Sequence, residues 1–459
     1  MHFVSIGEEG DWICADGDGT GPVFFISLTH QKALPVFQSK RQIEMNTKQY
    51  HKSPVNIIVL VAALGYFVDI YDLILFGIVR VPSLKAMGIA DNALISSGLF
   101  LMNMQMGGML LGGIFWGILG DKKGRLATLF GTILVYSLAN IANGFVGSDL
   151  NMYAALRFIA GFGLAGELGI GITLVSEVMT KENRAYATSI VSGVGICGAI
   201  LAYLVSQWGW RQAYWAGGIL GLCLLALRIY VNESGMFAKL KESSVKRGDF
   251  FSLFRSWKQF IKYLRCILIG VPVWFVIGIL ILYSKEFGEA LGVQEAISPG
   301  KAIMFHYTGA AIGSFLTGIL SQKLKSRRKT VAIAILFVAL MTFWYCGAWG
   351  ASGLLFYFIM FLLGVAQGYW AIFITVASEQ FGTNIRSTVT TTVPNFVRGM
   401  VILMTLMWKW MKDEPWCNAP AGHGILNAAL YVGIVVIVLA LLSIWKMDET
   451  HGKDLDYTE

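Results

Sequence analysis

Long runs of apolar residues, separated by short polar stretches, fill most of the chain after residue 52. A helix that crosses the hydrocarbon core of a bilayer needs roughly 20 such residues. Each run is therefore expected to form one spanning helix of an all-α membrane protein. The twelve predicted transmembrane helices lie at 55–79, 93–119, 126–147, 151–176, 185–206, 212–232, 264–284, 302–323, 330–349, 353–377, 387–409 and 424–446.

The longest polar interval between predicted spans, Asn232 to Arg265, divides them into six and six. Its segment Phe250 to Lys262 mixes bulky apolar and basic residues, which fits a helix in the inner headgroup region and a loop helix packed on the bundle equally well. The pattern predicts two six-helix bundles at 53–232 and 264–447, a cytoplasmic linker at 233–263 and a cytoplasmic tail at 448–459.

The first 52 residues differ from the rest, because they contain no long apolar run. Their longest apolar stretch is too short for a signal peptide. We expect a cytoplasmic N-terminal segment at 1–52. Since Met45 to Lys52 would suffice as a short lead into the first span, we hypothesise that translation starts at Met45. Mass spectrometry of the native N-terminus tests this hypothesis.

The composition argues against a soluble protein. Of the 459 residues, 56% are hydrophobic and only 14% are charged, whereas about a quarter of a soluble domain is charged. The six cysteines are scattered, with no CxxC pair and no histidine at metal-ligand spacing, so we expect no metal and no cofactor. There is no Ser/His constellation typical of an intramembrane enzyme and no GxxxxGK(S/T) loop of an ATP-driven pump.

Lys and Arg outnumber Asp and Glu by 36 to 28. In a membrane protein such an excess belongs to cytoplasmic loops rather than to a nucleic-acid site. With the N-terminus inside, about nineteen basic residues fall in inner loops and about seven in outer loops. We therefore expect an integral protein of the cell (inner) membrane, with both termini cytoplasmic, that functions as a monomer.

The chain repeats itself. Glu177 and Arg184 recur as Glu379 and Arg386, both at an offset of 202 residues. The loop at Gly117–Arg125 (GILGDKKGR) returns in altered form at Gly318–Arg328, with Gln322 where the aspartate would stand. Two halves related by duplication imply pseudo-two-fold symmetry and a substrate cavity near mid-membrane, at their interface.

The loop after the second span carries the strongest family signal. Gly117, Asp121, Lys122, Gly124 and Arg125 match the Gly-x-x-x-Asp-(Arg/Lys)-x-Gly-Arg signature. The chain resembles the major facilitator superfamily of secondary transporters from about residue 55 to 447. The resemblance implies two bundles that alternate access to a central solute site.

Three further pieces are similar to the branch that contains sugar porters and the proton symporters of aromatic acids, sialic acid and other carboxylates. Asp69 and Asp72 resemble the acid symporters' Asp-Gly-x-Asp. Arg157 begins a segment like the branch's Arg-x-x-x-Gly-x-Gly, and Glu167 stands where acid symporters often have a glutamate. Asn395 and Arg398 resemble the acid symporters' Asn-x-Gly-Arg.

Charges inside predicted spans are expensive and usually functional. Asp69 and Asp72 lie three apart on one helical face, and like charge and desolvation both disfavour ionising the two together. The resemblance to sugar porters pairs Asp72 with Arg157, a contact that could couple proton uptake to rearrangement. A static ion pair between helices is the alternative. Glu167 fits a proton relay or a neutral, hydrogen-bonded side chain.

Arg398 lies well inside its predicted span and cannot easily lose its proton. A bidentate guanidinium suits a carboxylate substrate, whereas pairing with Glu167 or with a backbone carbonyl would make it structural. Polar and aromatic residues on other spans are candidates for the cavity wall, although each alone fits helix packing. The candidate substrate-binding residues are Arg398, Asn395, Gln105, Trp274, Gln367 and Trp370.

The inner loops are expected to form a gate. An aspartate favours a helix N-terminus and an arginine favours a carboxylate, and in the family that this loop resembles it clasps neighbouring helix ends in one of the two access states. Solvated loop charge is the alternative. The candidate gating residues are Gly117, Asp121, Gly124, Arg125, Glu177, Arg184, Glu379 and Arg386.

These features together predict a proton-coupled secondary transporter of a small organic metabolite, with a carboxylate favoured. Its expected partners are the solute, protons and the lipid bilayer, and not nucleic acid. A neutral-sugar transporter of the same fold is the direct alternative. A membrane sensor or structural protein that moves no solute is the alternative from another class, and proton-linked uptake into vesicles discriminates among the three.

Overall fold

The computed structural model describes residues 2–5, 12–15, 24–26, 57–90, 93–180, 183–227, 248–419 and 423–452. The chain divides into two units, Met1–His51 and Lys52–Glu459. The hypothesised start at Met45, residues 233–247 of the predicted linker and residues 453–459 of the predicted tail lie outside the described residues.

The unit Met1–His51 contains three short strands, which the sequence analysis did not predict. They are β1 (His2–Ser5), β2 (Trp12–Ala15) and β3 (Phe24–Ile26). The strands pair antiparallel in the order β1-β2-β3. The all-α expectation therefore applies to the second unit alone.

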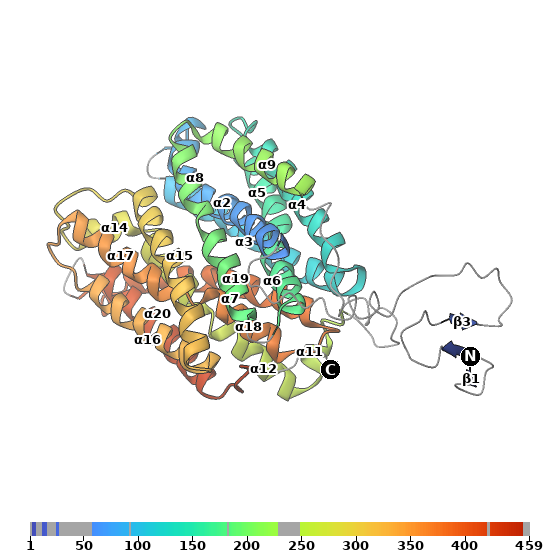
Figure 1. Cartoon of the computed structure of the whole chain (residues 1–459). Helices are drawn as coiled ribbons and strands as arrows, with labels where there is room; N and C mark the ends of the chain where they lie inside the picture. Colours follow the sequence, from blue (N-terminus) through green and yellow to red (C-terminus); the bar gives the residue numbers. More distant parts are fainter. Residues whose placement is uncertain are drawn as a thin grey trace. The chain divides into compact units, whose positions relative to one another are not determined.

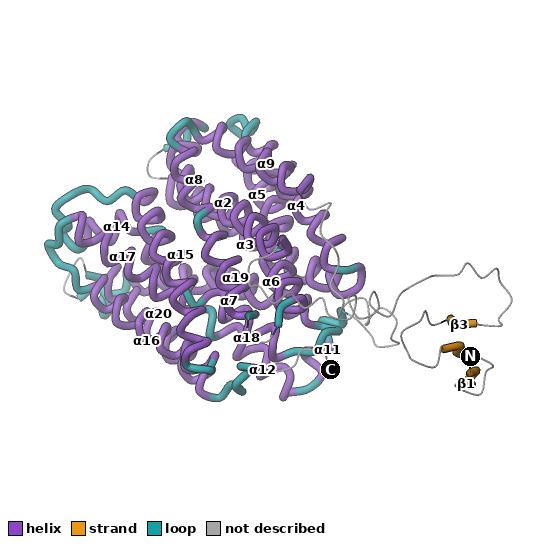
Figure 2. Tube along the Cα trace, viewed as in Figure 1, coloured by secondary structure: helices purple, strands orange, loops and turns teal. Residues whose placement is uncertain are grey.

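The described part of the unit Lys52–Glu459 is helical (Figure 2). In Figure 1 the blue-to-green helices gather on one side and the yellow-to-red helices on the other. The helices are α2 (Ile57–Ala86), α3 (Leu94–Lys123), α4 (Arg125–Asn143), α5 (Leu150–Leu164), α6 (Glu167–Val178), α7 (Arg184–Ile196), α8 (Gly198–Ser206), α9 (Trp210–Leu227), α11 (Ser252–Arg255), α12 (Trp257–Leu268), α13 (Val271–Phe275), the π-helix η3 (Val276–Ile281), α14 (Ser284–Ala290), α15 (Pro299–Lys323), α16 (Arg327–Cys346), α17 (Gly353–Gln367), α18 (Trp370–Gln380), α19 (Arg386–Lys412) and α20 (Gly424–Trp445).

Ten helical stretches in the described part of the chain are long and apolar enough to cross a membrane, and Ala127–Asn143 is a shorter apolar helix. Large apolar side chains on these helices face outward, among them Phe343, Leu354 and Trp445, each at least 70% exposed. Water would penalise such a surface and lipid would not. The chain is therefore an integral membrane protein.

Several predicted spans are broken helices, and two of them correspond to each other in the internal repeat. The span expected at 151–176 divides into α5 and α6 at Ala165–Gly166, and the span expected at 353–377 divides into α17 and α18 at Gly368–Tyr369. Both breaks occur at the corresponding place in the internal repeat. Breaks of this kind free backbone groups at mid-membrane, where transporters build solute sites.

The glycine-rich α3 packs closely on α5. A Cβ atom on Gly112 would lie 2.3 Å from the carbonyl oxygen of Phe162, and one on Gly161 would lie 2.2 Å from that of Gln105. In the second half, Gly364 on α17 approaches the backbone of His306 on α15 in the same way. Glycine is required at these positions because only a missing side chain lets two helix backbones come so close.

The segment from Phe250 to Lys262 buries Phe250 and Leu253 but exposes Phe251, Phe254 and Trp257. It contains α11 and the first half of α12, which continues into the seventh predicted span. The Tyr263 hydroxyl donates to Thr392 Oγ1 on α19 at 2.8 Å, and Lys262 donates to the carbonyl of Gln380 at 3.0 Å. These contacts fit a helix packed on the bundle, and the exposed aromatic side chains fit a helix in the headgroup region.

The described start of the C-terminal tail folds back on the N-terminus of α16. Glu449 accepts hydrogen bonds from the Ser326 hydroxyl and from the Arg327 backbone N–H, the latter at 2.9 Å. Burial alone would raise the pKa of Glu449, but these bonds and those from the backbone of Thr450 and His451 hold it below its ordinary value. Glu449 therefore caps α16 as an anion.

Candidate functional site

Two neighbouring cavities lie in the helical unit and share Trp274, Ile277 and Tyr307 as lining residues. We name them after the arginine that each contains. The Arg398 chamber contains about 370 Å³ of atom-free space and the Arg80 chamber about 530 Å³, part of it open to solvent. The Arg398 chamber is lined from both halves of the chain by Tyr66, Ile70, Ile196, Val273, Trp274, Ile277, His306, Tyr307, Ala310, Gln367, Trp370 and Arg398.

Arg398, on α19, is 1% exposed and faces Asp69 on α2. Its Nη2 atom lies 3.9 Å from Asp69 Oδ2, which is an ion pair without a hydrogen bond. Nη1 donates to Asn395 Oδ1 at 3.0 Å, whereas Nε and Nη2 have no hydrogen-bond partner among the described residues. Two adjacent donors of the guanidinium are thus available to a carboxylate.

Aromatic rings surround this guanidinium. The Arg398 carbon Cζ lies 5.7 Å from the centroid of the Trp274 ring and 6.0 Å from that of the Trp370 ring. Tyr66 and Tyr307 complete the aromatic part of the wall. Such walls exclude water and bind flat apolar bodies, while the cation fixes an anionic end.

Gln367 and His306 form a hydrogen-bonded pair in the same wall. His306 Nε2 lies 2.9 Å from Gln367 Oε1, and the Gln367 amide donates to the carbonyl of Val273 at 2.9 Å. Gln367 is therefore oriented by the fold, and it reaches the chamber with its partners already in place.

Two of the other residues that were predicted to bind substrate do not line the Arg398 chamber. Asn395 does not line the chamber. Its amide nitrogen donates to the carbonyls of Ala165 and Thr391, each at 2.7 Å, so it holds α19 against the break between α5 and α6. Gln105 lines the Arg80 chamber and donates to the carbonyl of Leu73 at 3.4 Å.

Asp72 and Arg157 lie inside the first half, away from the Arg398 chamber lining. They are close enough for their charges to interact, but no ion pair of 4 Å or less joins these two described side chains. The Arg157 guanidinium instead lies over the rings of Phe76 and Tyr214, at 5.3 and 5.6 Å. Neither carboxylate oxygen of Asp72 has a hydrogen-bond partner among the described residues. The predicted pair is thus a loose contact here.

Glu167 begins α6 and is buried. The first turn of a helix favours a carboxylate because of its free N–H groups. Glu167 also lies close enough to Asp69 for the two charges to interact. The ion pair that Arg398 makes among the described residues is with Asp69, whereas the sequence analysis had considered Glu167.

The gating residues gather at one end of the unit. Asp121, at the end of α3, accepts hydrogen bonds from the backbone N–H groups of Ser387 and Thr388 at 3.1 and 2.7 Å. It also accepts one from the Thr388 hydroxyl at 2.7 Å. A carboxylate from the first half thus caps α19 of the second half, where the helix dipole favours negative charge.

Arginine and glutamate side chains extend this contact. Arg125 lies 3.0 Å from Glu177, and Arg386 of the second half lies 3.2 Å from the same carboxylate. In the second half, Arg327 pairs with Glu379 at 3.4 Å. The Arg125–Glu177 and Arg327–Glu379 pairs have the same spacing of 52 residues, and they repeat each other across the two halves.

The remaining gating candidates support this end of the unit. A Cβ atom on Gly117 would lie 2.9 Å from the Cα of Thr388, so this glycine lets α3 and α19 meet. Gly124 has a φ of +108°, which a residue with a side chain adopts poorly. Arg184 begins α7, and its side chain lies outside the described residues.

Asp121→Asn is expected to loosen this gate. It would place an amide donor against the N–H groups of α19, losing on the order of 2 kcal/mol. The equilibrium between closed and open gate should then shift about thirty-fold. Hydrogen exchange of the amides at 386–391 measures the shift.

The exposed neighbour Lys122 supplies the control, because Lys122→Gln changes a charge in the same loop without touching α19. Equal protection of 386–391 in Asp121→Asn and Lys122→Gln would show that Asp121 does not hold the gate.

Among the described residues, no three His, Cys, Asp or Glu side chains gather in a way that could hold a metal ion. The Arg398 chamber presents an arginine, with Asp69 close to it, and aromatic groups. These groups can bind an anion and exchange a proton.

The sequence model of the Major Facilitator Superfamily matches residues 58–405 of this chain. The chain belongs to this superfamily, and it is a transporter rather than an enzyme. The match confirms the resemblance drawn from the loop signature at Gly117–Arg125.

Individual proteins that are similar to this chain are also transporters of small solutes. The chain is 27% identical over 321 residues to a sialic acid transporter of Escherichia coli, covering 66% of this chain and 75% of the relative. It is 26% identical over 346 residues to a gentisate transporter of Corynebacterium glutamicum, covering 70% and 73%. A solved proton:xylose symporter has the same fold, with a TM-score of 0.72 and 17% identity over 87% of this chain and 97% of that one.

Proposed function

We propose that this protein is a proton-coupled transporter of a small organic acid that works by alternating access of two six-helix bundles. The observation that carries the proposal is Arg398. It is a buried cation in the wall of an aromatic cavity, and two of its donors have no partner among the described residues. The similarity to a sialic acid transporter and to a gentisate transporter supports an acidic solute.

In the proposed cycle, Asp69 and the solute compete for Arg398. When Asp69 is ionised, its charge interacts with the guanidinium across 3.9 Å. When Asp69 takes up a proton, Arg398 becomes free to bind a carboxylate bidentately. Solute and proton therefore load together, which is the linkage that symport requires.

The gate supplies the second half of the cycle. The contacts of Asp121 and Glu177 with α19 and Arg386 close one end of the unit, and the excess of basic residues in the inner loops assigns that end to the cytoplasm. Breaking these contacts would release the solute inward. The matched helix breaks and the repeated Arg–Glu pairs support twelve spans in two pseudo-symmetric bundles, with both termini cytoplasmic.

A thermal-shift experiment on the purified protein tests the solute class. Benzoate should raise the melting temperature and benzamide, which has the same ring without the charge, should not. Neutral sugars should also fail to stabilise the protein. Stabilisation by a sugar but not by any acid would replace this proposal with the neutral-sugar transporter.

A further inference from the structure

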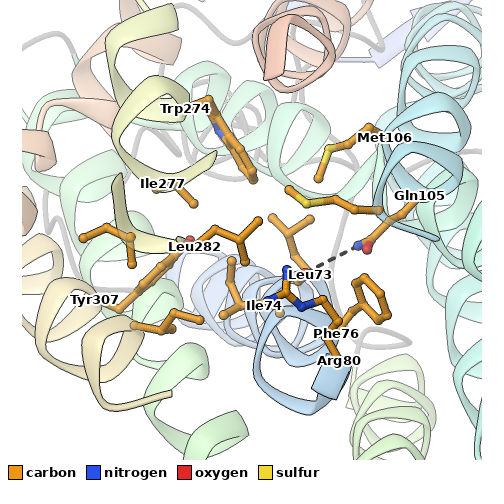
Figure 3. A pocket seen from close by; sticks show the side chains of 14 residues that line it. Leu73, Ile74, Phe76, Arg80, Gln105, Met106, Trp274, Ile277, Leu282 and Tyr307 are labelled. Carbon is orange, nitrogen blue, oxygen red and sulfur yellow. Dashed lines mark hydrogen bonds between the residues drawn. The ribbon is translucent and has the colours of Figure 1, made fainter. Parts of the chain in front are cut away.

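The Arg80 chamber has no role in the cycle described so far. Figure 3 shows the Arg80 side chain directed into it from α2, beside Phe76 and facing Trp274 and Tyr307 across the cavity. Apart from Arg80, Gln105 and the Tyr307 hydroxyl, its wall is apolar. The remaining lining residues are Leu73, Ile74, Phe76, Gly77, Met102, Met106, Trp274, Ile277, Ile281, Leu282 and Ile303.

Arg80 is a buried cation that forms no ion pair with a described carboxylate. Only 7% of the residue is exposed, and its guanidinium donates no hydrogen bond and forms no ion pair with any described residue. Gly98 on α3 makes room for it, since a Cβ atom there would lie 2.5 Å from Arg80 Cδ. The fold therefore fixes this arginine in place and leaves its five donors unused.

A guanidinium without a described protein partner, in a mostly apolar wall, depends on water or on a solute for its hydrogen bonds. An anion that enters the chamber would supply the missing hydrogen bonds and charge. The apolar remainder of the wall suits a solute whose body is a ring or a hydrocarbon, as in the neighbouring Arg398 chamber. The two chambers thus present the same combination of groups twice.

The positions of the two chambers along α2 give the order in which an arriving solute would meet them. Arg80 follows Asp69 by eleven positions on α2, or about 16 Å of helix, toward the end that lies away from the gate. The two chambers share only three lining residues, Trp274, Ile277 and Tyr307. A solute that arrives from the end opposite the gate would meet Arg80 first and would pass these three side chains to reach Arg398.

We propose that the Arg80 chamber is a second binding site, which takes the carboxylate of the arriving solute before it moves to Arg398. This inference rests on the proposed function, because it assumes an acidic solute. It adds a site and a residue, Arg80, whose charge speeds capture of anions without taking part in proton coupling.

Stopped-flow binding of benzoate to the full-length protein tests the order. Arg80→Gln should lower the association rate about ten-fold at low ionic strength, with a smaller effect at high salt. Arg80→Lys keeps the charge and should retain most of the rate. Lys85→Gln removes an exposed charge from the same helix outside the chamber and should leave the rate unchanged.

Equilibrium binding tests the second site directly. In Arg398→Gln, weak binding of benzoate over benzamide should persist, and adding Arg80→Gln should abolish that preference. If Arg80→Gln changes neither the rate nor the residual preference, the Arg80 site is wrong while the proposed function stands. If wild type itself shows no preference for benzoate over benzamide, the proposed function fails.

Discussion

Asp69→Asn is expected to abolish proton-driven accumulation of solute while exchange between equal pools continues. The variant imitates the protonated carboxyl permanently, so Arg398 stays free for solute and no proton needs to bind. In wild-type proteoliposomes, a gradient of one pH unit should support about ten-fold accumulation for one coupled proton, because one pH unit corresponds to a factor of ten in equilibrium. In Asp69→Asn, accumulation should fall to the level of equal concentrations. Protein-free vesicles correct for passive permeation of the acid.

Asp72→Asn is the informative comparison, because Asp72 lies three residues away on the same helix, whereas the ion pair of Arg398 among the described residues is with Asp69. Accumulation that survives in Asp69→Asn and disappears in Asp72→Asn would move the coupling site to Asp72 and Arg157. The sequence analysis favoured that pair, although the structure leaves it without an ion pair of 4 Å or less between these described residues.

Arg398→Gln is expected to weaken acid binding about ten- to one-hundred-fold, since a charge-assisted contact in a buried site contributes about 1.5–3 kcal/mol. Binding of the matched amide should change little. Arg398→Lys keeps the charge and loses the planar fork, so it should fall between wild type and Arg398→Gln. Isothermal titration of benzoate and benzamide measures all three proteins.

Arg211→Gln is a suitable control for this series. It removes an arginine that lies over the Trp210 ring, 4.1 Å from its centroid, and lines neither chamber. An equal loss of benzoate and benzamide binding in Arg398→Gln would mean that Arg398 supports the fold of the chamber and does not select charge.

The sequence predicted the fold well because its signals are local. Apolar runs, the loop signature at Gly117–Arg125 and the offset of 202 residues are all readable without knowing which helices touch. The same applies to Asp121, whose preference for a helix N-terminus predicted a capping role before its partner, α19, was known.

Contacts between helices were harder to predict, because helical rotation and register depend on packing. Asn395 and Arg398 are three residues apart, yet Arg398 lines the chamber and Asn395 bonds to the carbonyl of Ala165. Spacing alone likewise showed that Glu379 and Arg386 repeat Glu177 and Arg184, but not that Arg386 pairs with Glu177 of the other half.

Arg80 was overlooked for a different reason. The apolar run ends at residue 79, so Arg80 was assigned to an outer loop. The helix α2 continues to Ala86 and includes Pro82. A proline near the end of a helix looks like a stop in the sequence, although neighbouring helices can support the turn that contains it.

The central claim is that Asp69 takes up a proton when an acid occupies Arg398. Isothermal titration of benzoate in buffers of different ionisation enthalpy counts the protons taken up on binding. At a pH where benzoate is an anion and Asp69 is ionised in the free protein, wild type should take up about one proton for each acid bound, and Asp69→Asn should take up none. Binding without proton uptake in wild type, or uptake that is unchanged in Asp69→Asn, would contradict the account.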